Sequence, residues 1–160
     1  MDTNFLALAE VELRVKLALV KQNSVWQPVR WSVMELLPAE AMVTDLEKES
    51  GVFQNLVLRV YQDELQGYFL NLDAENPCLS FLVRHPDEDV SRLPTVVDVT
   101  ASYDVAARWM DSNENVQTLP MPGVMAAWLA ELVQARYQPE PKRRRRPQSF
   151  VSPGERYNHE

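Results

Sequence analysis

The fold is decided by residues 10–20, which read E-V-E-L-R-V-K-L-A-L-V. Apolar side chains occupy every second position and charged side chains fill most of the positions between them, with Val11, Leu13, Val15, Leu17 and Leu19 opposite Glu12, Arg14 and Lys16. Successive side chains of a strand point to opposite faces, so this pattern predicts a half-buried β-strand. A polar connection at residues 21–24 leads to a second predicted strand at about residues 27–37, which ends at Pro38. The two strands are expected to form an antiparallel pair.

Four more strands are expected between residues 53 and 100. The segments 53–61, 67–72 and 78–84 each alternate apolar and other residues, and the connections between them are short and polar. Short connections favour neighbouring antiparallel strands, which predicts a meander. The run P-T-V-V-D-V-T predicts a further strand at residues 95–100, and the polar residues 38–51 predict a loop with a short helical turn.

Beyond residue 100 the apolar residues follow a helical period. Ser102 is a candidate N-cap for a short helix that ends near residue 111, residues 116–120 are extended, and a longer helix is expected at residues 123–137. Strands followed by helices indicate an α+β fold, a mainly antiparallel sheet or partly open β-barrel of about six strands followed by two helices. Residues 1–137 are expected to form one domain, and the Pro/Arg-rich residues 138–160 a tail that is disordered until bound.

The charge is divided along the chain. The formal net charge is -7, yet residues 138–160 carry six basic against three acidic residues, which leaves -10 on residues 1–137. An acidic body repels phosphate backbones, so only the run Arg143, Arg144, Arg145 and Arg146 could supply the cations that nucleic-acid binding requires. This run is expected to stay solvated or to dock on an acidic surface, of a partner or of the chain itself.

Composition excludes several classes of site. No apolar run reaches the roughly 18 residues of a membrane helix, no secretory signal is apparent, and the one cysteine forms no intrachain disulfide, so we expect a cytoplasmic protein. Cys78, His85 and His159 are too few for a zinc or iron–sulfur site. The sequence contains neither of the phosphate-binding motifs G-x-x-x-x-G-K and G-x-G-x-x-G, and it lacks the nucleophile motif G-x-S-x-G. We therefore expect no enzyme, no metal and no cofactor.

The segment W-Q-P-V-R-W at residues 26–31 is the candidate contact surface. Trp26, Arg30 and Trp31 could stack on one another, and tryptophan and arginine dominate binding hot spots. In the alternative interpretation Trp31 shares the core face of its strand with Val29 and Val33, and Trp26 lies over the start of the strand.

Several segments together resemble a known family. They are Trp26-Gln27-x-x-Arg30-Trp31 with Leu37-Pro38, Gly67-Tyr68-x-x-Asn71-Leu72, Val99-Thr100-Ala101-Ser102 with Ala106, Pro120-Met121-Pro122 with Ala127-Trp128, and Pro139-Glu140-Pro141 before the basic run. In this order they resemble, over residues 10–146, an uncharacterised bacterial family whose genes often neighbour those of molybdenum- and iron–sulfur-containing formate dehydrogenases. The resemblance assigns no catalytic residue. It implies an accessory role in assembly or maturation of such a metalloenzyme.

Three functions are therefore weighed. The leading hypothesis is a non-enzymatic accessory protein whose partner is a formate dehydrogenase subunit or maturation factor. The second is a small-molecule or cofactor binder with a pocket in the β-barrel. The third is nucleic-acid binding through the arginine tail, which the acidic body disfavours.

Overall fold

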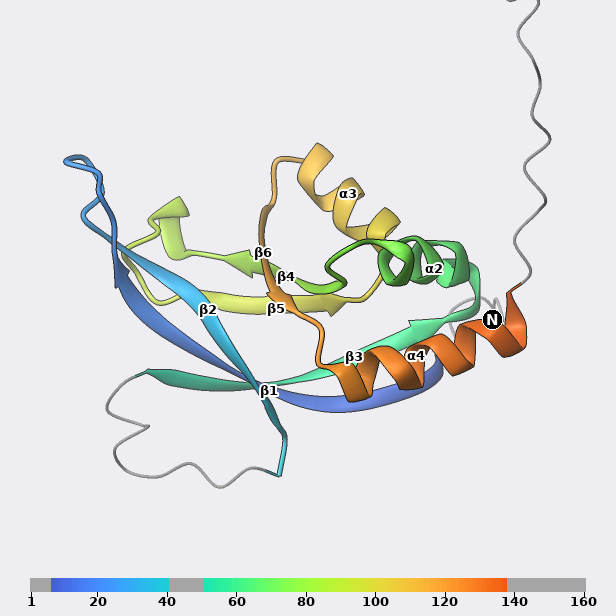
Figure 1. Cartoon of the computed structure of the whole chain (residues 1–160). Helices are drawn as coiled ribbons and strands as arrows, with labels where there is room; N and C mark the ends of the chain where they lie inside the picture. The colour runs from blue at the N-terminus through green and yellow to red at the C-terminus, as the bar shows by residue number, and fades with distance from the viewer. Residues whose placement is uncertain (1–6, 41–50, 138–160) are drawn as a thin grey trace, which may run out of the picture.

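The computed structural model describes residues 7–40 and 51–137, and the α+β fold is confirmed (Figure 1). Within these described residues, six antiparallel strands divide between two three-stranded sheets. The first sheet has the order β2-β1-β3, from β1 (Ala7–Lys21), β2 (Val29–Pro38) and β3 (Val52–Tyr61). The second has the order β5-β4-β6, from β4 (Cys78–Arg84), β5 (Thr95–Thr100) and β6 (Asn115–Pro120). The described helices are α2 (Leu65–Asp73), α3 (Tyr103–Asp111) and α4 (Gly123–Arg136), with short 3-10 turns η2 (Gln62–Glu64) and η3 (Pro86–Glu88).

β1 is the central strand of the first sheet, and its alternating pattern gives it one apolar face along most of its length. It pairs antiparallel with β2 on one side and with β3 on the other. Leu13, Val15 and Leu17 are buried, as the period-two pattern predicts. Leu19 is half exposed, so the apolar face is not buried as far as the end of β1 that joins the hairpin.

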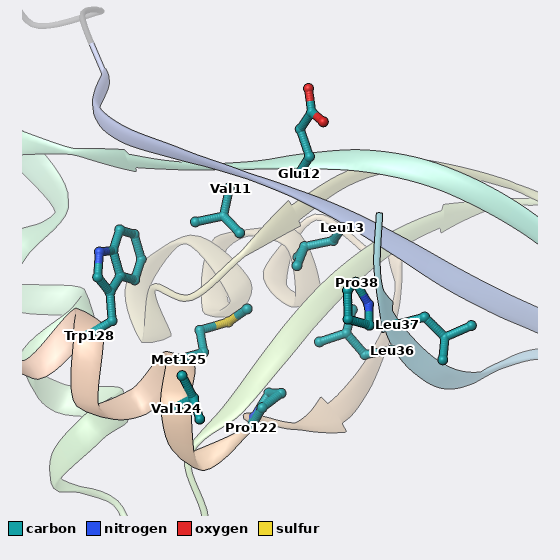
Figure 2. A pocket seen from close by; sticks show the side chains of 10 residues that line it. All are labelled: Val11, Glu12, Leu13, Leu36, Leu37, Pro38, Pro122, Val124, Met125 and Trp128. Carbon is teal, nitrogen blue, oxygen red and sulfur yellow. The ribbon is translucent and has the colours of Figure 1, made fainter. Parts of the chain in front are cut away.

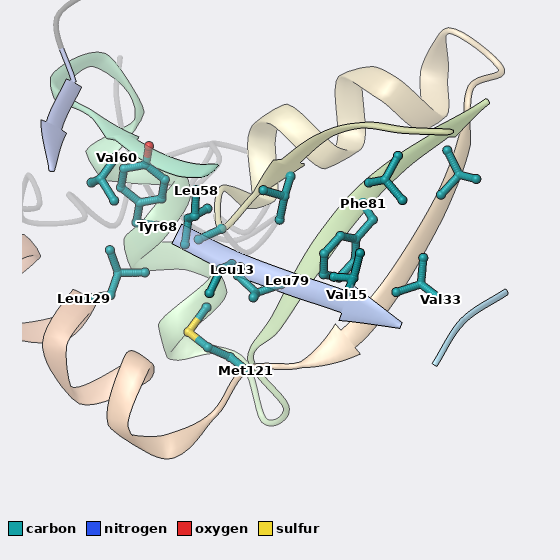
Figure 3. Packing of buried hydrophobic residues seen from close by; sticks show 14 of the residues in the cluster. Leu13, Val15, Val33, Leu58, Val60, Tyr68, Leu79, Phe81, Met121 and Leu129 are labelled. Carbon is teal, nitrogen blue, oxygen red and sulfur yellow. The ribbon is translucent and has the colours of Figure 1, made fainter. Parts of the chain in front are cut away.

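The hydrophobic core lies between the two sheets and continues beneath α2 and α4 (Figure 3). β1 and β3 contribute Leu13, Val15, Leu58 and Val60 from one side, and β4 contributes Leu79 and Phe81 from the other. Leu129 of α4, Tyr68 of α2 and Met121 close the end of the core. No described helix has the length and apolar character needed to cross a membrane.

Two glutamine side chains join the sheets where their edges meet. Gln54 of β3 donates from Nε2 to the carbonyl of Val96 in β5 at 2.7 Å and accepts from the Val96 amide at 3.0 Å. At the opposite edge, Gln117 of β6 accepts from the Val33 amide of β2 at 2.6 Å. Each carboxamide satisfies edge-strand groups that a neighbouring strand would otherwise pair. The strands therefore approach a barrel but do not close into one.

Replacement of Gln54 by alanine should destabilise the protein by about 2 kcal/mol, because it leaves both backbone groups of the buried Val96 without partners. The free energy of unfolding from urea titration measures the effect. Gln66 is an exposed glutamine on α2, so Gln66→Ala is the matched control and should change the free energy by less than about 0.5 kcal/mol. An equal effect of the two substitutions would show that the Gln54 contacts contribute nothing.

The predicted strand at residues 67–72 is wrong, and so is the meander that depended on it. These residues lie in α2, which crosses from β3 in one sheet to β4 in the other. Leu65, Tyr68 and Asn71 are buried at a spacing of three, so a helical face overrides the short alternation of Tyr68, Leu70 and Leu72. The segment contains no β-branched residue, and this composition argues against a strand because such residues are enriched in strands.

The number of strands agrees with the prediction only because another segment replaces this one. Residues 116–120, predicted merely as extended, lie in strand β6, which pairs with β4. β4 and β5 have the predicted bounds, and α3 and α4 lie close to theirs. Ser102 is the predicted N-cap of α3, and its Oγ accepts from the Val105 amide at 3.2 Å.

Candidate functional site

The tip of the β1–β2 hairpin carries the most exposed apolar side chains among the described residues. Val25 and Trp26 are 94% and 92% exposed. The connection is closed at its base, where the Gln22 amide donates to the Pro28 carbonyl at 2.8 Å, and within it the Gln27 amide donates to Ser24 Oγ at 3.3 Å. The hairpin therefore holds two apolar side chains in solvent on a bonded turn. We call residues 22–28 the hairpin tip.

The three residues of the predicted contact surface do not stack. Trp31 is partly buried and packs against the core, whereas Trp26 is almost fully in solvent and does not cover the start of β2. Arg30 points elsewhere, and its Nη2 donates to Asn115 Oδ1 of β6 at 3.0 Å. The three side chains therefore lie in three different environments and form no common surface. Of the two tryptophans, only Trp26 is almost fully exposed.

The run Arg143–Arg146 lies outside the described residues, so its role as a contact with an acidic surface stays a prediction. Residues 87–89, which read Asp-Glu-Asp, form an acidic loop within the described part of the chain. Asp87 pairs with Arg92 at 2.6 Å, and hydrogen bonds from the Ser91 hydroxyl and amide lower the pKa of Asp89. Within the described part of the chain, no three Cys, His, Asp or Glu side chains gather as metal ligands would.

An apolar groove of about 560 Å³ runs between the first sheet and α4 (Figure 2). Val11 and Leu13 of β1 and Leu36 of β2 form one wall, and Met125 and Trp128 of α4 form the other. Val124, at the start of α4, is 86% exposed beside it. Apolar residues at the period of a strand or a helix indicate which side chains face the core. They do not show where the core opens to the surface, so the sequence did not predict this groove.

A buried polar cluster joins α2 to the start of α3. Asn71 donates from Nδ2 to the carbonyls of Cys78 at 2.7 Å and Ala101 at 2.8 Å, and its Oδ1 accepts from the Cys78 amide at 3.1 Å. Nearby, Ser102 Oγ donates to Glu64 Oε2 at 2.9 Å. Each contact satisfies a backbone group or a cap. The cluster therefore has the character of a scaffold.

Two further hydrogen bonds in the same neighbourhood involve side chains whose pKa values are raised, Tyr68 and Arg108. The Tyr68 hydroxyl accepts from the Tyr61 amide at 2.8 Å, and burial raises the pKa of Tyr68 well above its ordinary value. Arg108 donates to the other Glu64 oxygen at 2.8 Å, a hydrogen bond that raises the pKa of Arg108. Glu64 thus ties the start of α2 to α3 through two partners.

A protein-family model matches residues 12–146, and its description is protein of unknown function (DUF3305). The match covers most of the chain. The protein belongs to the DUF3305 family. The searches of curated proteins and of solved structures found no match. The expectation of an uncharacterised family is confirmed, whereas the comparisons carry no information on gene neighbourhood or on formate dehydrogenase.

The segments that carried the resemblance meet at two places in this DUF3305 protein. Gly67 and Asn71 of one segment contact Ser102 and Ala101 of another, at the polar cluster. Leu37 and Pro38 line the apolar groove with Pro122 and Trp128. The residues at the polar cluster have a structural role, since they hold α2 against the second sheet. Among the described residues of the quoted segments, Trp26 of the hairpin tip is the largest side chain that is almost fully exposed.

Proposed function

We propose that this DUF3305 protein is a non-enzymatic accessory protein that binds a protein partner through its hairpin tip. The observation that carries the proposal is the exposure of Val25 and Trp26, at 94% and 92%. Large apolar side chains held in water lose free energy when a partner buries them, and tryptophan is enriched among the residues that dominate binding.

The construction of the tip suits it to binding. Two hydrogen bonds restrain the turn, so less conformational entropy is lost on association than from a free loop. Residues 22–29 contain no charged residue, and charged residues are depleted in the centre of interfaces. A partner would therefore meet an apolar centre without desolvating a charge of this chain.

For the identity of the partner we propose a formate dehydrogenase subunit or one of its maturation factors. The support is the resemblance of the quoted segments to a family with that gene neighbourhood. The basic run at residues 143–146 would add an electrostatic contact to an acidic region of the partner. Such a contact would weaken as salt is raised, whereas the apolar contact at the tip would not.

Replacement of Trp26 by serine should weaken partner binding by about 30-fold, which corresponds to about 2 kcal/mol, because it removes the largest side chain of the tip. The free energy of unfolding should stay within about 0.5 kcal/mol, since the side chain contacts almost nothing in the folded protein. A binding titration with the captured partner and a urea titration measure the two quantities.

Tyr103 supplies the matched control. It is an exposed aromatic side chain on α3, 60% in solvent, so Tyr103→Ser should leave binding unchanged. Trp26→Phe should restore part of the affinity, because an aromatic ring again fills the contact. If Trp26→Ser binds as tightly as the natural chain, the hairpin tip is not the contact.

Small-molecule binding is the second candidate function, and the apolar groove favours it. Its volume of about 560 Å³ lies within the range of ligand pockets, although it opens between a sheet and α4 rather than inside a barrel. Nucleic-acid binding through residues 143–146 remains the third. It predicts an affinity that falls steeply with salt and disappears when residues 138–160 are removed.

A further inference from the structure

A second recess, of about 640 Å³, lies where the first sheet meets the end of β4 and the start of β6. Arg30 of β2 lines it together with Arg84 and His85 at the end of β4, Glu88 of η3, and Glu114 and Asn115 beside β6. We call it the Arg30 cleft. Charged and amide side chains form much of its wall, in contrast to the apolar groove beside α4.

Arg30 is the cation of this cleft that has no carboxylate partner among the described residues. Arg84 is neutralised by Glu114, at 3.2 Å. Arg30 Nη2 donates to the neutral Asn115 amide oxygen, and Arg30 Nε is buried with no hydrogen-bond partner in the part of the chain that the structure describes. Unpaired buried donors are rare in folded proteins, and a guanidinium group is suited to a carboxylate because its N–H groups match two oxygens.

His85 supplies a second unpaired nitrogen to the same cleft. Its Nδ1 lies 3.1 Å from the Arg92 carbonyl, which can only accept, so Nδ1 carries a hydrogen. In the neutral ring Nε2 is therefore an acceptor, and it is buried without a partner among the described residues. The wall of the cleft thus holds one unpaired donor, on Arg30, and one unpaired acceptor, on His85.

We propose that the Arg30 cleft binds a carboxylate that carries a neighbouring hydrogen-bond donor. The carboxylate accepts from Arg30 Nε–H, and the neighbouring hydroxyl, ammonium or amide N–H donates to His85 Nε2. Both nitrogens are buried although their residues line the cleft, so binding requires the Arg30 side chain to leave its hydrogen bond with Asn115 and uncover them. A small hydroxy acid and the C-terminus of a peptide share this chemistry.

The Arg30 Nε–H resonance of the full-length, nitrogen-15-labelled protein tests the proposal directly. Glycolate, acetate, triglycine and triglycine amide are titrated at constant ionic strength, with sodium chloride as the reference. Glycolate or triglycine should shift this resonance along a saturating curve, with a dissociation constant on the order of 1 mM. The Arg59 Nε–H, which donates to Glu10 on the exposed side of β3, should not move.

The probes separate the two sources of the carboxylate. Tighter binding of triglycine than of glycolate, with loss of binding for triglycine amide, identifies a chain terminus, whereas tighter binding of glycolate identifies a small acid. Acetate binding as tight as that of glycolate would overturn the role given to His85. No saturable shift with any probe, or the same shift with chloride, would overturn the proposal.

Arg30→Lys assigns the resonance, because lysine has no Nε–H, and keeps the positive charge. Followed through the backbone amide resonances of Glu114 and Asn115, which line the cleft, this variant should bind the preferred probe at least about tenfold more weakly, since an ammonium group cannot reproduce the planar fork. Arg59→Lys is the matched control and should bind like the natural chain. The inference does not rest on the hairpin tip, so Trp26→Ser should leave the binding of glycolate unchanged.

Discussion

Asn71→Ala should lower the free energy of unfolding by about 3 kcal/mol, which is roughly 10 °C in Tm for a domain of this size. The Asn71 carboxamide makes three hydrogen bonds to the backbone, two to Cys78 and one to Ala101. Alanine cannot reach any of these groups, so three backbone groups at the junction of α2, β4 and β5 lose their partner. Urea titration and thermal unfolding measure the loss.

The matched control is Asn55→Ala, in which the same atoms are removed from an exposed asparagine of β3. Its Oδ1 accepts from Arg14 Nε at 2.9 Å on the surface, and the expected change is less than about 0.5 kcal/mol. If Asn71→Ala were as mild as Asn55→Ala, the polar cluster would not be the scaffold that the structure indicates.

Gly67→Ala should destabilise the protein by about 3 kcal/mol, although alanine is the better helix former. A Cβ at this position would overlap with Ser102 Oγ and lie 3.1 Å from Ser102 Cβ, because α2 approaches the start of α3 closely. Ser102 is fixed as the N-cap of α3 and as the donor to Glu64, so it cannot move aside without losing both contacts.

The same substitution should change sign when Ser102 is glycine. In the Ser102→Gly background the overlapping atoms are absent, and the higher helix propensity of alanine should make Gly67→Ala stabilising by up to about 1 kcal/mol. A double-mutant cycle from urea titrations gives the coupling. An equal cost of Gly67→Ala in both backgrounds would contradict the packing of α2 on Ser102.

Alternating patterns predicted the strands that have one buried face and one exposed face. β1, β4 and β5 follow from their sequences, and the N-cap at Ser102 follows from its side chain. α2 could not be predicted from alternation because nine residues are too few to separate the two periods, and two of the residues on its buried face, Gly67 and Asn71, are not apolar markers. Tertiary contacts to Ser102 and Ala101 decide it.

The joining of the two sheets was beyond sequence reasoning for a different reason. Gln54 and Gln117 are ordinary polar residues in strand patterns, and nothing local indicates that they bond to strands 42 and 84 residues away. Sequence identified Trp26 and Arg30 as unusual, but only their positions in space separate an exposed contact from a residue of the Arg30 cleft.

In the function that we propose, the hairpin tip, not the apolar groove, is the surface that meets a partner. Val25 and Val124 allow a direct comparison, because both are valines and are 94% and 86% exposed. One lies on the tip and the other beside the groove. Neither should affect stability by more than about 0.5 kcal/mol, so each reports on binding.

The decisive measurement is affinity capture of partners from extracts of the cells in which the protein naturally occurs. Three full-length forms are compared: the natural chain, the Val25→Ser/Trp26→Ser variant and the Val124→Ser variant. Recovery of formate dehydrogenase subunits and maturation factors is quantified by mass spectrometry. If the hairpin tip is the contact, recovery should fall at least about tenfold for the hairpin variant and be unchanged for Val124→Ser. Equal recovery by the natural chain and the hairpin variant, or loss only with Val124→Ser, would contradict the proposal.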